Sequence, residues 1–295
     1  GHRAGQYVQV GVDLPDSAKR MTRCFSISSA ASQPGEEITL TIRAHDEGQV
    51  SKHLVHHAQP GQMLHLSQAE GDFTLDESPA TPTNNHLLFI TGGSGITPAM
   101  SMIRTLLRDG YDGRAGRKVT FLHYARSAED QIFAAELAEI AAGDNDVTVH
   151  LRHGEQVFSE FELRRLVPGY RATDTWACGP AGLMALVATA YDGSSRLRTE
   201  FFKAPRVDAG SAEGDVSFER SGKEAANTGA TLLEQAEALG LKPEFGCRMG
   251  ICFSCTSRKT DGTVRNVLTG AESSLPDEDI QICVTTPVGD CAVDL

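Results

Sequence analysis

The chain has 295 residues, of which 40% are hydrophobic and 22% are charged, so it is long enough for two or three domains that each bury a core. Its net charge of −12 argues against a nucleic-acid partner, because phosphate binding needs a basic surface. It contains no run of about 18 or more consecutive apolar residues, so we expect no membrane span. The first residues contain neither a starting Met nor an apolar segment, so we expect no signal peptide and a first domain that begins part-way through.

Residues 1–78 are predicted to form an antiparallel β-barrel domain that is incomplete at its N-terminus. Short runs of alternating apolar and polar residues, separated by turns that contain glycine and proline, are typical of its strands. These strands are predicted at residues 7–10, 23–27, 38–43 and 63–66. One helix is expected at 50–57, with Ser51 as its N-cap.

Residues 79–202 are predicted to form an α/β domain with a parallel sheet. A continuous apolar run at 87–90 is typical of a strand that is buried on both faces. Strand and helix alternate along this segment, which indicates helices on both faces of the sheet. The further strands are predicted at 119–124, 147–151 and 175–177, and the helices at 98–108, 131–142, 160–166 and 181–191.

Residues 203–213 have the small, polar composition of a linker, and residues 214–295 are predicted to form a third domain. We expect a strand at 215–220 and an amphipathic helix at 231–239. The third domain contains 13 acidic and 7 basic residues. Such an acidic module commonly docks on a basic partner surface, although the charge can equally serve solubility alone.

The cysteine pattern is the strongest functional signal. Seven cysteines fit a disulfide framework poorly, and three of them lie within nine residues. Gly246 and Gly250 allow the backbone of this loop to approach bound sulfide. The C-x4-C-x2-C…C spacing is that of plant-type [2Fe–2S] ferredoxins, whereas zinc sites favour paired C-x2-C units. The predicted cluster ligands are Cys247, Cys252, Cys255 and Cys283.

Two further motifs become informative beside the cysteine loop. Arg23-Cys-Phe25-Ser26 lies on a predicted strand, where Arg and Ser alone usually mean a solvated face. The glycine-rich segment 91–98 lies between a buried strand and a helix, which is the setting of a phosphate-binding turn. Together the three motifs resemble the ferredoxin–NADP reductase superfamily. The resemblance covers nearly the whole chain and implies a flavin barrel, a nucleotide domain and a C-terminal β-grasp ferredoxin domain.

By this resemblance, Arg23 contacts the flavin pyrophosphate, Phe25 packs on the isoalloxazine ring and Ser26 lies near flavin N5. Phe25 stands where the family usually has Tyr, so a hydroxyl contact is lost and weaker flavin retention is expected. FAD is the expected flavin, and FMN stays open. The residues expected to bind the flavin are Arg23, Phe25, Ser26, Ile42, Gly48, Val50 and Ser51.

The resemblance also implies a nicotinamide site. Cys178 is expected beside the nicotinamide, and Ser26 and Cys178 are the expected catalytic residues. The alternative for Cys178 is an inert buried thiol. Arg126, Ser127 and Arg152 are expected to receive the 2′-phosphate of NADPH, although solvated loop arginines would look the same. The remaining residues expected at the dinucleotide are Thr91, Gly92, Gly93, Gly95, Ile96, Thr97, Pro98, Gly179 and Pro180.

The implied function is that of a cytoplasmic oxidoreductase that passes electrons from NADPH (or NADH) through FAD and the [2Fe–2S] cluster. The implied acceptor is a terminal oxygenase or a membrane acyl-CoA desaturase, and the chain would then lie peripheral to such a membrane-bound partner. One alternative is an NADH-dependent reductase component of a Rieske-type ring or steroid hydroxylase. Another is a ferredoxin-type carrier or redox sensor without turnover.

Overall fold

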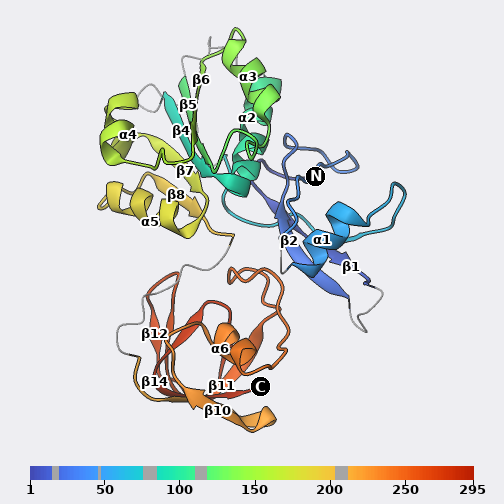
Figure 1. Cartoon of the computed structure of the whole chain (residues 1–295), viewed down its shortest axis with the longest axis vertical. Helices are drawn as coiled ribbons and strands as arrows, with labels where there is room; N and C mark the ends of the chain where they lie inside the picture. Colours follow the sequence, from blue (N-terminus) through green and yellow to red (C-terminus); the bar gives the residue numbers. More distant parts are fainter. Residues whose placement is uncertain (15–19, 46–47, 76–84, 110–117, 203–211) are drawn as a thin grey trace. The chain divides into compact units, whose positions relative to one another are not determined.

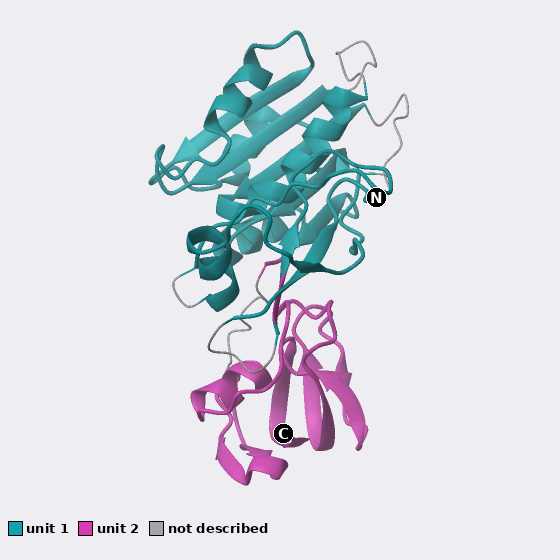
Figure 2. Cartoon of the chain, turned by 90° about the vertical axis from the view of Figure 1, so that its right-hand side faces the viewer, with its two compact units in different colours: residues 1–20, 24–200 teal, residues 21–23, 201–295 magenta. Residues whose placement is uncertain are grey.

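The computed structural model describes residues 1–14, 20–45, 48–75, 85–109, 118–202 and 212–295. The predicted domain boundary at 78/79 and most of the predicted linker 203–213 lie outside these residues. The described chain divides into two compact units (Figure 2). The first unit consists of Gly1–Arg20 with Cys24–Glu200, and the second of Met21–Arg23 with Phe201–Leu295.

The N-terminal part of the chain contains a small antiparallel sheet. Its strands are β1 (Tyr7–Val12), β2 (Met21–Ser26) and β3 (His65–Leu66), in the order β2-β1-β3. The strand predicted at 38–43 was wrong, because only Ile27 and Leu40 form a bridge there. The backbone N–H of Ser28 donates to Thr39 O, but the Ser29 hydroxyl accepts the hydrogen bond from Thr39 N in place of a backbone oxygen.

Helix α1 (Gln49–His56) confirms the predicted helix, but its predicted N-cap was wrong. Gly48 is the N-cap, and Ser51 lies in the first turn. The Ser51 hydroxyl donates to Gly48 O and accepts from the backbone N–H of His45, so it fastens the preceding chain to the helix. The hydroxyl thus reaches backward along the chain, whereas an N-cap side chain bonds forward to the helix.

The central domain is a doubly wound parallel sheet, with helices on either side (Figure 1). Its strand order is β6-β5-β4-β7-β8, so the order reverses between β4 and β7. The strands are β4 (His86–Gly92), β5 (Lys118–Ala125), β6 (Val147–His153), β7 (Asp174–Cys178) and β8 (Leu197–Glu200). The helices are α2 (Ile96–Arg108), α3 (Ala134–Ala142), α4 (Glu160–Leu166) and α5 (Ala181–Ala190). The four predicted strands and four predicted helices are confirmed, whereas β8 was missed.

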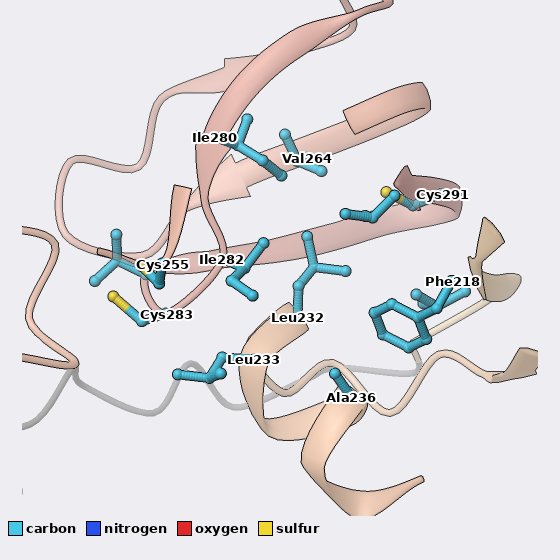
Figure 3. Close-up of a cluster of buried hydrophobic side chains, with 13 residues drawn as sticks. Phe218, Leu232, Leu233, Ala236, Cys255, Val264, Ile280, Ile282, Cys283 and Cys291 are labelled. Carbon is cyan, nitrogen blue, oxygen red and sulfur yellow. The ribbon is translucent and has the colours of Figure 1, made fainter. Parts of the chain in front are cut away.

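The second unit contains a mixed sheet of the β-grasp type, with α6 (Leu232–Ala238) packed on its core. Strand β9 (Asp215–Phe218) runs parallel to β14 (Thr285–Asp294), and the other pairs are antiparallel. The remaining strands are β10 (Lys223–Ala226), β11 (Thr256–Asn266), β12 (Glu272–Ser273) and β13 (Glu278–Gln281). Thr231 and Glu234 form a reciprocal capping box that starts α6, and its buried Leu232, Leu233 and Ala236 face the sheet (Figure 3).

In the ranges given above, none of the helices combines the length and the apolar character that crossing a bilayer requires.

Candidate functional site

Two glycine turns press against each other at the carboxyl ends of β4 and β7, where the strand order reverses. A Cβ atom on Gly95 would lie 2.3 Å from the backbone oxygen of Cys178, and one on Gly179 would lie 3.0 Å from the backbone nitrogen of Gly92. Neither position has room for a side chain, because the backbone of the turn after β4 packs directly against the backbone of the turn after β7. Crevices at such a switch point are where open α/β sheets bind their ligands.

The first turn of α2 suits a phosphate group. Its N-cap is Gly95, which has no side chain to satisfy the first N–H groups of the helix. The side chains of Ile96, Thr97 and Pro98 are buried, so a ligand at this turn meets mainly backbone. Gly93 has a φ of 53°, which favours glycine. The residues present therefore fit the pyrophosphate of a dinucleotide.

Thr91 is held by a hydrogen bond to the neighbouring strand β5. Its hydroxyl lies 2.7 Å from Nδ1 of His123 on β5, and both residues are buried. Burial lowers the pKa of His123 to about 4, so the imidazole is neutral at pH 7. Thr91 thus supports the sheet beneath the phosphate turn.

Cys178 is paired in register with Glu200 at the carboxyl ends of β7 and β8. Burial raises the pKa of the Cys178 thiol, and the charge of Glu200 raises it further, so the thiol stays neutral. Burial also raises the pKa of Glu200 to about 8. Its Oε2 atom is buried and has no hydrogen-bond partner among the described residues. A protonated carboxyl group beside Cys178 is thus available to a ligand, and the sequence reasoning missed it.

Arg126 and Ser127 lie just beyond β5, where the 2′-phosphate was expected. The guanidinium groups of Arg126 and Arg43 each lie 3.1 Å from the same carboxylate oxygen of Asp130. The Arg126 side chain is 72% exposed, and the Ser127 hydroxyl caps the backbone N–H of Asp130. Two cations therefore share the Asp130 carboxylate at this edge, and the carboxylate of Glu129 forms a hydrogen bond with Ser127. A phosphate here would compete with these two carboxylates for the Arg126 guanidinium and the Ser127 hydroxyl.

Arg152 is in a different situation. Its guanidinium donates from both Nε and Nη2 to one carboxylate oxygen of Glu162, at 2.8 and 2.6 Å. Both side chains are only 19% exposed. A phosphate would have to displace this largely buried partner, so Arg152 is less available than Arg126.

The flavin motif lies at the end of β2. Ser26 is buried, and Phe25 and Arg23 are half-buried. Arg23 donates through Nη1 to Thr22 O and groups with the second unit, as described above. The bridge between Ile27 and Leu40 brings the segment that carries Ile42 alongside the motif strand.

The second predicted flavin segment forms a tight turn into α1. A Cβ atom on Gly48 would lie 2.5 Å from the Ser51 hydroxyl, so a side chain there would displace this hydroxyl from its hydrogen bonds to His45 and Gly48. Val50 is fully buried and anchors the start of the helix. The backbone at this helix start suits a phosphate oxygen in the same way as the start of α2 does.

The four predicted cluster ligands come together in the second unit. All seven cysteines lie within the described residues, and none of them forms a disulfide. Hydrogen bonds with Cys247 and then with Cys255 raise the pKa of Cys283, and a hydrogen bond with Cys247 raises that of Cys252. The Cys283 hydrogen bond lowers the pKa of Cys255 to about 7. Figure 3 shows Cys255 and Cys283 side by side at one end of the core.

The loop backbone is wrapped closely around these sulfur atoms. The N–H groups of Cys247 and Met249 donate to the sulfur atoms of Cys252 and Cys247, at 3.1 and 3.3 Å. A Cβ atom on Gly246 would lie 2.7 Å from the Cys252 sulfur. Backbone N–H groups that donate to cysteine sulfur atoms, and a glycine where the backbone comes closest to a sulfur atom, are features that fit an iron–sulfur cluster.

No three His, Cys, Asp or Glu side chains within the described ranges have the spacing to hold a single metal ion. A [2Fe–2S] cluster needs a wider arrangement, because its four thiolates are divided between two irons. The hydrogen-bonded set of four thiols matches the ligand number and type of such a cluster.

Comparison with known proteins gives the same three parts of the chain, one for the flavin, one for the dinucleotide and one for the cluster. Residues 1–75 match the oxidoreductase FAD-binding domain, residues 89–189 the oxidoreductase NAD-binding domain, and residues 217–288 the 2Fe-2S iron-sulfur cluster binding domain. The chain is 38% identical to the NADPH oxidoreductase of Mycobacterium tuberculosis over 100% of its own length and 77% of that protein. The chain belongs to the ferredoxin–NADP reductase superfamily. It is one of the three-part reductases that carry a C-terminal ferredoxin domain.

Two other similarities cover nearly the whole reductase. It is 28% identical to the glycine betaine monooxygenase reductase subunit of Pseudomonas aeruginosa, over 99% of this chain and 87% of that protein. Its fold matches phthalate dioxygenase reductase with a TM-score of 0.61 at 22% identity, covering 99% of this chain and 88% of that one. The reductase is therefore an NAD(P)H-dependent oxidoreductase with FAD, NAD(P) and [2Fe–2S] sites.

The structure thus brings together two groups of predicted residues, those at the β4/β7 crevice and the four cysteines. Glu200 is the residue that sequence reasoning missed. A signal existed: an acidic residue ends a short segment of strand-like sequence near the end of the nucleotide domain. Its meaning depended on a contact between neighbouring strands, which the sequence pattern alone did not reveal.

Proposed function

We propose that this reductase accepts hydride from NADPH at the β4/β7 crevice and delivers single electrons through its cysteine loop to an oxygenase. The observation that carries the proposal is the combination, in one chain, of a backbone-lined dinucleotide crevice with four thiols that a chain of hydrogen bonds brings together. A bound flavin supplies the exchange between two-electron and one-electron chemistry, because it is stable with zero, one or two added electrons. The domain limits that we propose are 1–78, 79–202 and 214–295.

We propose that Cys178 and Glu200 form one wall of the nicotinamide site. The neutral thiol offers a compact, uncharged surface, and the protonated carboxyl group can donate a hydrogen bond to the ligand. Ser26 is proposed to place its hydroxyl near the reactive flavin nitrogen. These groups orient the ligands and keep water away from the hydride, and none of them needs to become charged.

We propose NADPH as the preferred coenzyme, with Arg126 and Ser127 at its 2′-phosphate. The exposed guanidinium of Arg126 supports this assignment, and Arg43 adds a second cation beside it. Charge-assisted hydrogen bonds from arginine are strong and suit the three oxygens of a phosphate group. The similarity to a mycobacterial NADPH oxidoreductase points in the same direction.

We propose a terminal oxygenase as the electron acceptor. The similarity to a monooxygenase reductase subunit supports this class. A membrane acyl-CoA desaturase is the more specific candidate from the sequence resemblance. A cytoplasmic location, peripheral to the membrane if the acceptor is membrane-bound, is part of the same proposal, since thiol-ligated clusters suit a reducing compartment.

The test is anaerobic titration of the flavin-loaded protein with NADPH and with NADH, followed by absorbance. We expect flavin absorbance to bleach first and cluster absorbance to follow. Cys255→Ala should lose iron and cytochrome c reduction but keep NADPH-dependent ferricyanide reduction at the flavin. Cys291→Ala is the matched control, because Cys291 is an equally buried thiol outside the loop, and it should keep both activities.

Wild-type protein that lacks iron and acid-labile sulfide after anaerobic preparation would contradict the proposal. So would equal loss of cytochrome c reduction in the Cys255→Ala and Cys291→Ala variants.

A further inference from the structure

Helix α2 carries a polar stripe on one face, although most of the helix is buried. The stripe faces the chain segment that follows the flavin motif. Its members are spaced at i, i+3, i+4 and i+7, so they lie on one side of the helix. They are Ser101, Arg104, Thr105 and Arg108.

Each member of the stripe bonds to the backbone of residues 28–31. The Ser101 hydroxyl donates to Ser29 O at 2.6 Å, and the Thr105 hydroxyl accepts from Ala31 N at 2.8 Å. The guanidinium groups of Arg104 and Arg108 donate to the backbone oxygens of Ser28 and Ala31. Three residues of the flavin segment, Ser28, Ser29 and Ala31, are therefore fastened to one helix of the nucleotide domain.

The fastened segment has little freedom on its other side. The backbone N–H of Ser28 donates to Thr39 O at 2.8 Å, and its hydroxyl lies 2.9 Å from that of Thr41. Ser28 follows the buried Ser26 by two residues. A shift of the segment relative to α2 would therefore also shift the strand end that carries the flavin motif.

The opposite end of α2 begins at the phosphate turn. Gly95 packs there against Cys178, as described above. Ten residues of regular helix, Ile96 to Thr105, span about 14 Å from the first to the last Cα. Arg104 pairs with Glu136 of α3 at 2.6 and 2.7 Å, and this ion pair braces the C-terminal half of the helix. The helix thus links the dinucleotide turn to the flavin motif as a rigid element.

We propose that the polar stripe of α2 sets the distance between the bound nicotinamide and the flavin, so that Ser101, Arg104 and Thr105 are positioning residues for hydride transfer. The inference rests on the proposed function. In that step the C–H bond at nicotinamide C4 breaks, and the hydrogen leaves with its electron pair to form the N–H bond at flavin N5. Such a transfer needs the two atoms at roughly 3–3.5 Å, so small displacements strongly reduce the rate.

The deciding variant is Thr105→Val, which keeps the shape of the side chain but removes the hydroxyl. Thr105→Ser restores the hydroxyl and serves as the rescue. Thr189→Val is the matched control, because Thr189 makes the same bond to the carbonyl four residues back but lies exposed on α5. Ser101→Ala removes a neighbouring contact independently and replaces Thr105→Val if that variant does not fold.

Two measurements are made on the full chain loaded with flavin. Stopped-flow reduction by NADPH gives the limiting rate of flavin reduction and the dissociation constant for NADPH. Hydrogen–deuterium exchange of the peptide around Ala31 reports the contact itself, without any turnover. We expect Thr105→Val to lower the limiting rate by about 10- to 100-fold. The NADPH dissociation constant should stay nearly unchanged, the Ala31 amide should exchange faster, and Thr105→Ser should recover most of the rate.

An unchanged limiting rate together with faster exchange at Ala31 would overturn the inference. So would a rate that falls only in proportion to flavin content and is not recovered by Thr105→Ser, since that result means a structural role. If neither NADPH nor NADH reduces the wild-type flavin, the proposed function fails and this inference fails with it. A normally reduced wild type with an unaffected variant overturns this inference alone.

Discussion

The dinucleotide crevice and the cysteine loop both depend on glycine, but for different physical reasons. At the crevice, Gly95 has a φ of −63° and Gly92 a φ of −143°, which are ordinary values for any residue. Glycine is needed there because a Cβ atom on Gly95 would collide with the Cys178 backbone, and one on Gly92 would lie 2.8 Å from the side chains of Pro180 and Leu183. Gly93, between them, is the exception, with a φ of 53°. In the cysteine loop, Arg248, Gly250 and Phe253 all have positive φ, at 59°, 75° and 55°. Glycine suits that loop because its backbone is left-handed.

The loop also holds two side chains in this unfavourable conformation, at a cost of about 1–3 kcal/mol each. Local contacts offset part of that cost. Arg248 pairs with Glu237 and stacks 3.8 Å from the ring centroid of Phe245. The Phe253 carbonyl accepts from both the backbone and the hydroxyl of Thr256, at 3.0 and 2.7 Å.

The comparison indicates that the two sites form differently. The sheet topology shapes the crevice without a ligand, since parallel strands deliver both turns to one edge. The loop stores backbone strain, so thiolate ligation contributes directly to its stability. Mutation of Gly95 at the crevice should therefore act through a steric contact, whereas mutation of Gly250 in the loop should act through backbone conformation together with its contact to Val284.

The largest effect is expected for Gly95→Ala. The added methyl group would lie 2.3 Å from the Cys178 backbone oxygen, so the two turns must separate. A displacement of about 1 Å at the nicotinamide can lower the rate of hydride transfer about 10²-fold. Stopped-flow reduction of the flavin by NADPH measures this loss, while iron content should stay at the wild-type level.

Gly182→Ala is the matched control for that variant. Gly182 lies exposed in α5, and its Cβ would meet open space among the described residues. The substitution should leave hydride transfer unchanged and raise stability by about 0.4–1 kcal/mol, because alanine favours the helix. Equal rates for both glycine variants would contradict the steric account of the crevice.

Much of the crevice was predictable because its signals are local. The apolar strand, the glycine turn and the following helix are consecutive in sequence, and the parallel sheet then places the turn beside Cys178. Glu200 was not predictable in this way, because its pairing with Cys178 joins β7 to β8, and the pattern of β8 is weak. The ion pair of Arg152 with Glu162 likewise depends on the packing of α4 against β6.

The flavin segment shows where sequence periodicity fails. Residues 38–43 alternate like a strand, yet the Ser29 hydroxyl accepts the hydrogen bond from Thr39 N that a regular ladder would give to a backbone oxygen. The predicted N-cap at Ser51 failed for a related reason, since the Ser51 hydroxyl bonds backward to His45 and Gly48. Side-chain competition with backbone pairing depends on tertiary placement, which periodicity does not contain.

A smaller effect is expected for Gly250→Ala in the cysteine loop. Alanine at a φ of 75° costs about 1–2 kcal/mol, and its Cβ would lie 2.8 Å from the buried Val284 side chain. The loop should then hold its thiols less well, and iron and acid-labile sulfide per chain should fall. Gly270→Ala is the control: Gly270 has a similar φ of 73°, and its Cβ would meet open space among the described residues. Full cluster content in Gly250→Ala would show that the loop tolerates this change of conformation.

The last effect concerns pH and the buried carboxyl group at the crevice, and it is spread over several pH units. Folding raises the pKa of Glu200 to about 8 from an ordinary value of 4.5. Between these values the folded chain retains a proton that the unfolded chain has lost, so the free energy of unfolding falls as pH rises. The slope from this one group is at most about 1.4 kcal/mol per pH unit.

Glu200→Gln should remove that slope, because the amide does not titrate in this range. Urea unfolding followed by the fluorescence of Trp176 reports the nucleotide domain, since this buried residue is the chain's only tryptophan. Between pH 5 and pH 8 the free energy of unfolding should fall for the wild type but not for Glu200→Gln. The control is Glu155→Gln, on an exposed turn, and its free energy of unfolding should follow that of the wild type. Parallel pH profiles for wild type and Glu200→Gln would mean that water or a neighbouring group stabilises the carboxylate. The crevice would then hold a charge beside Cys178, and the uncharged wall proposed for the nicotinamide would be wrong.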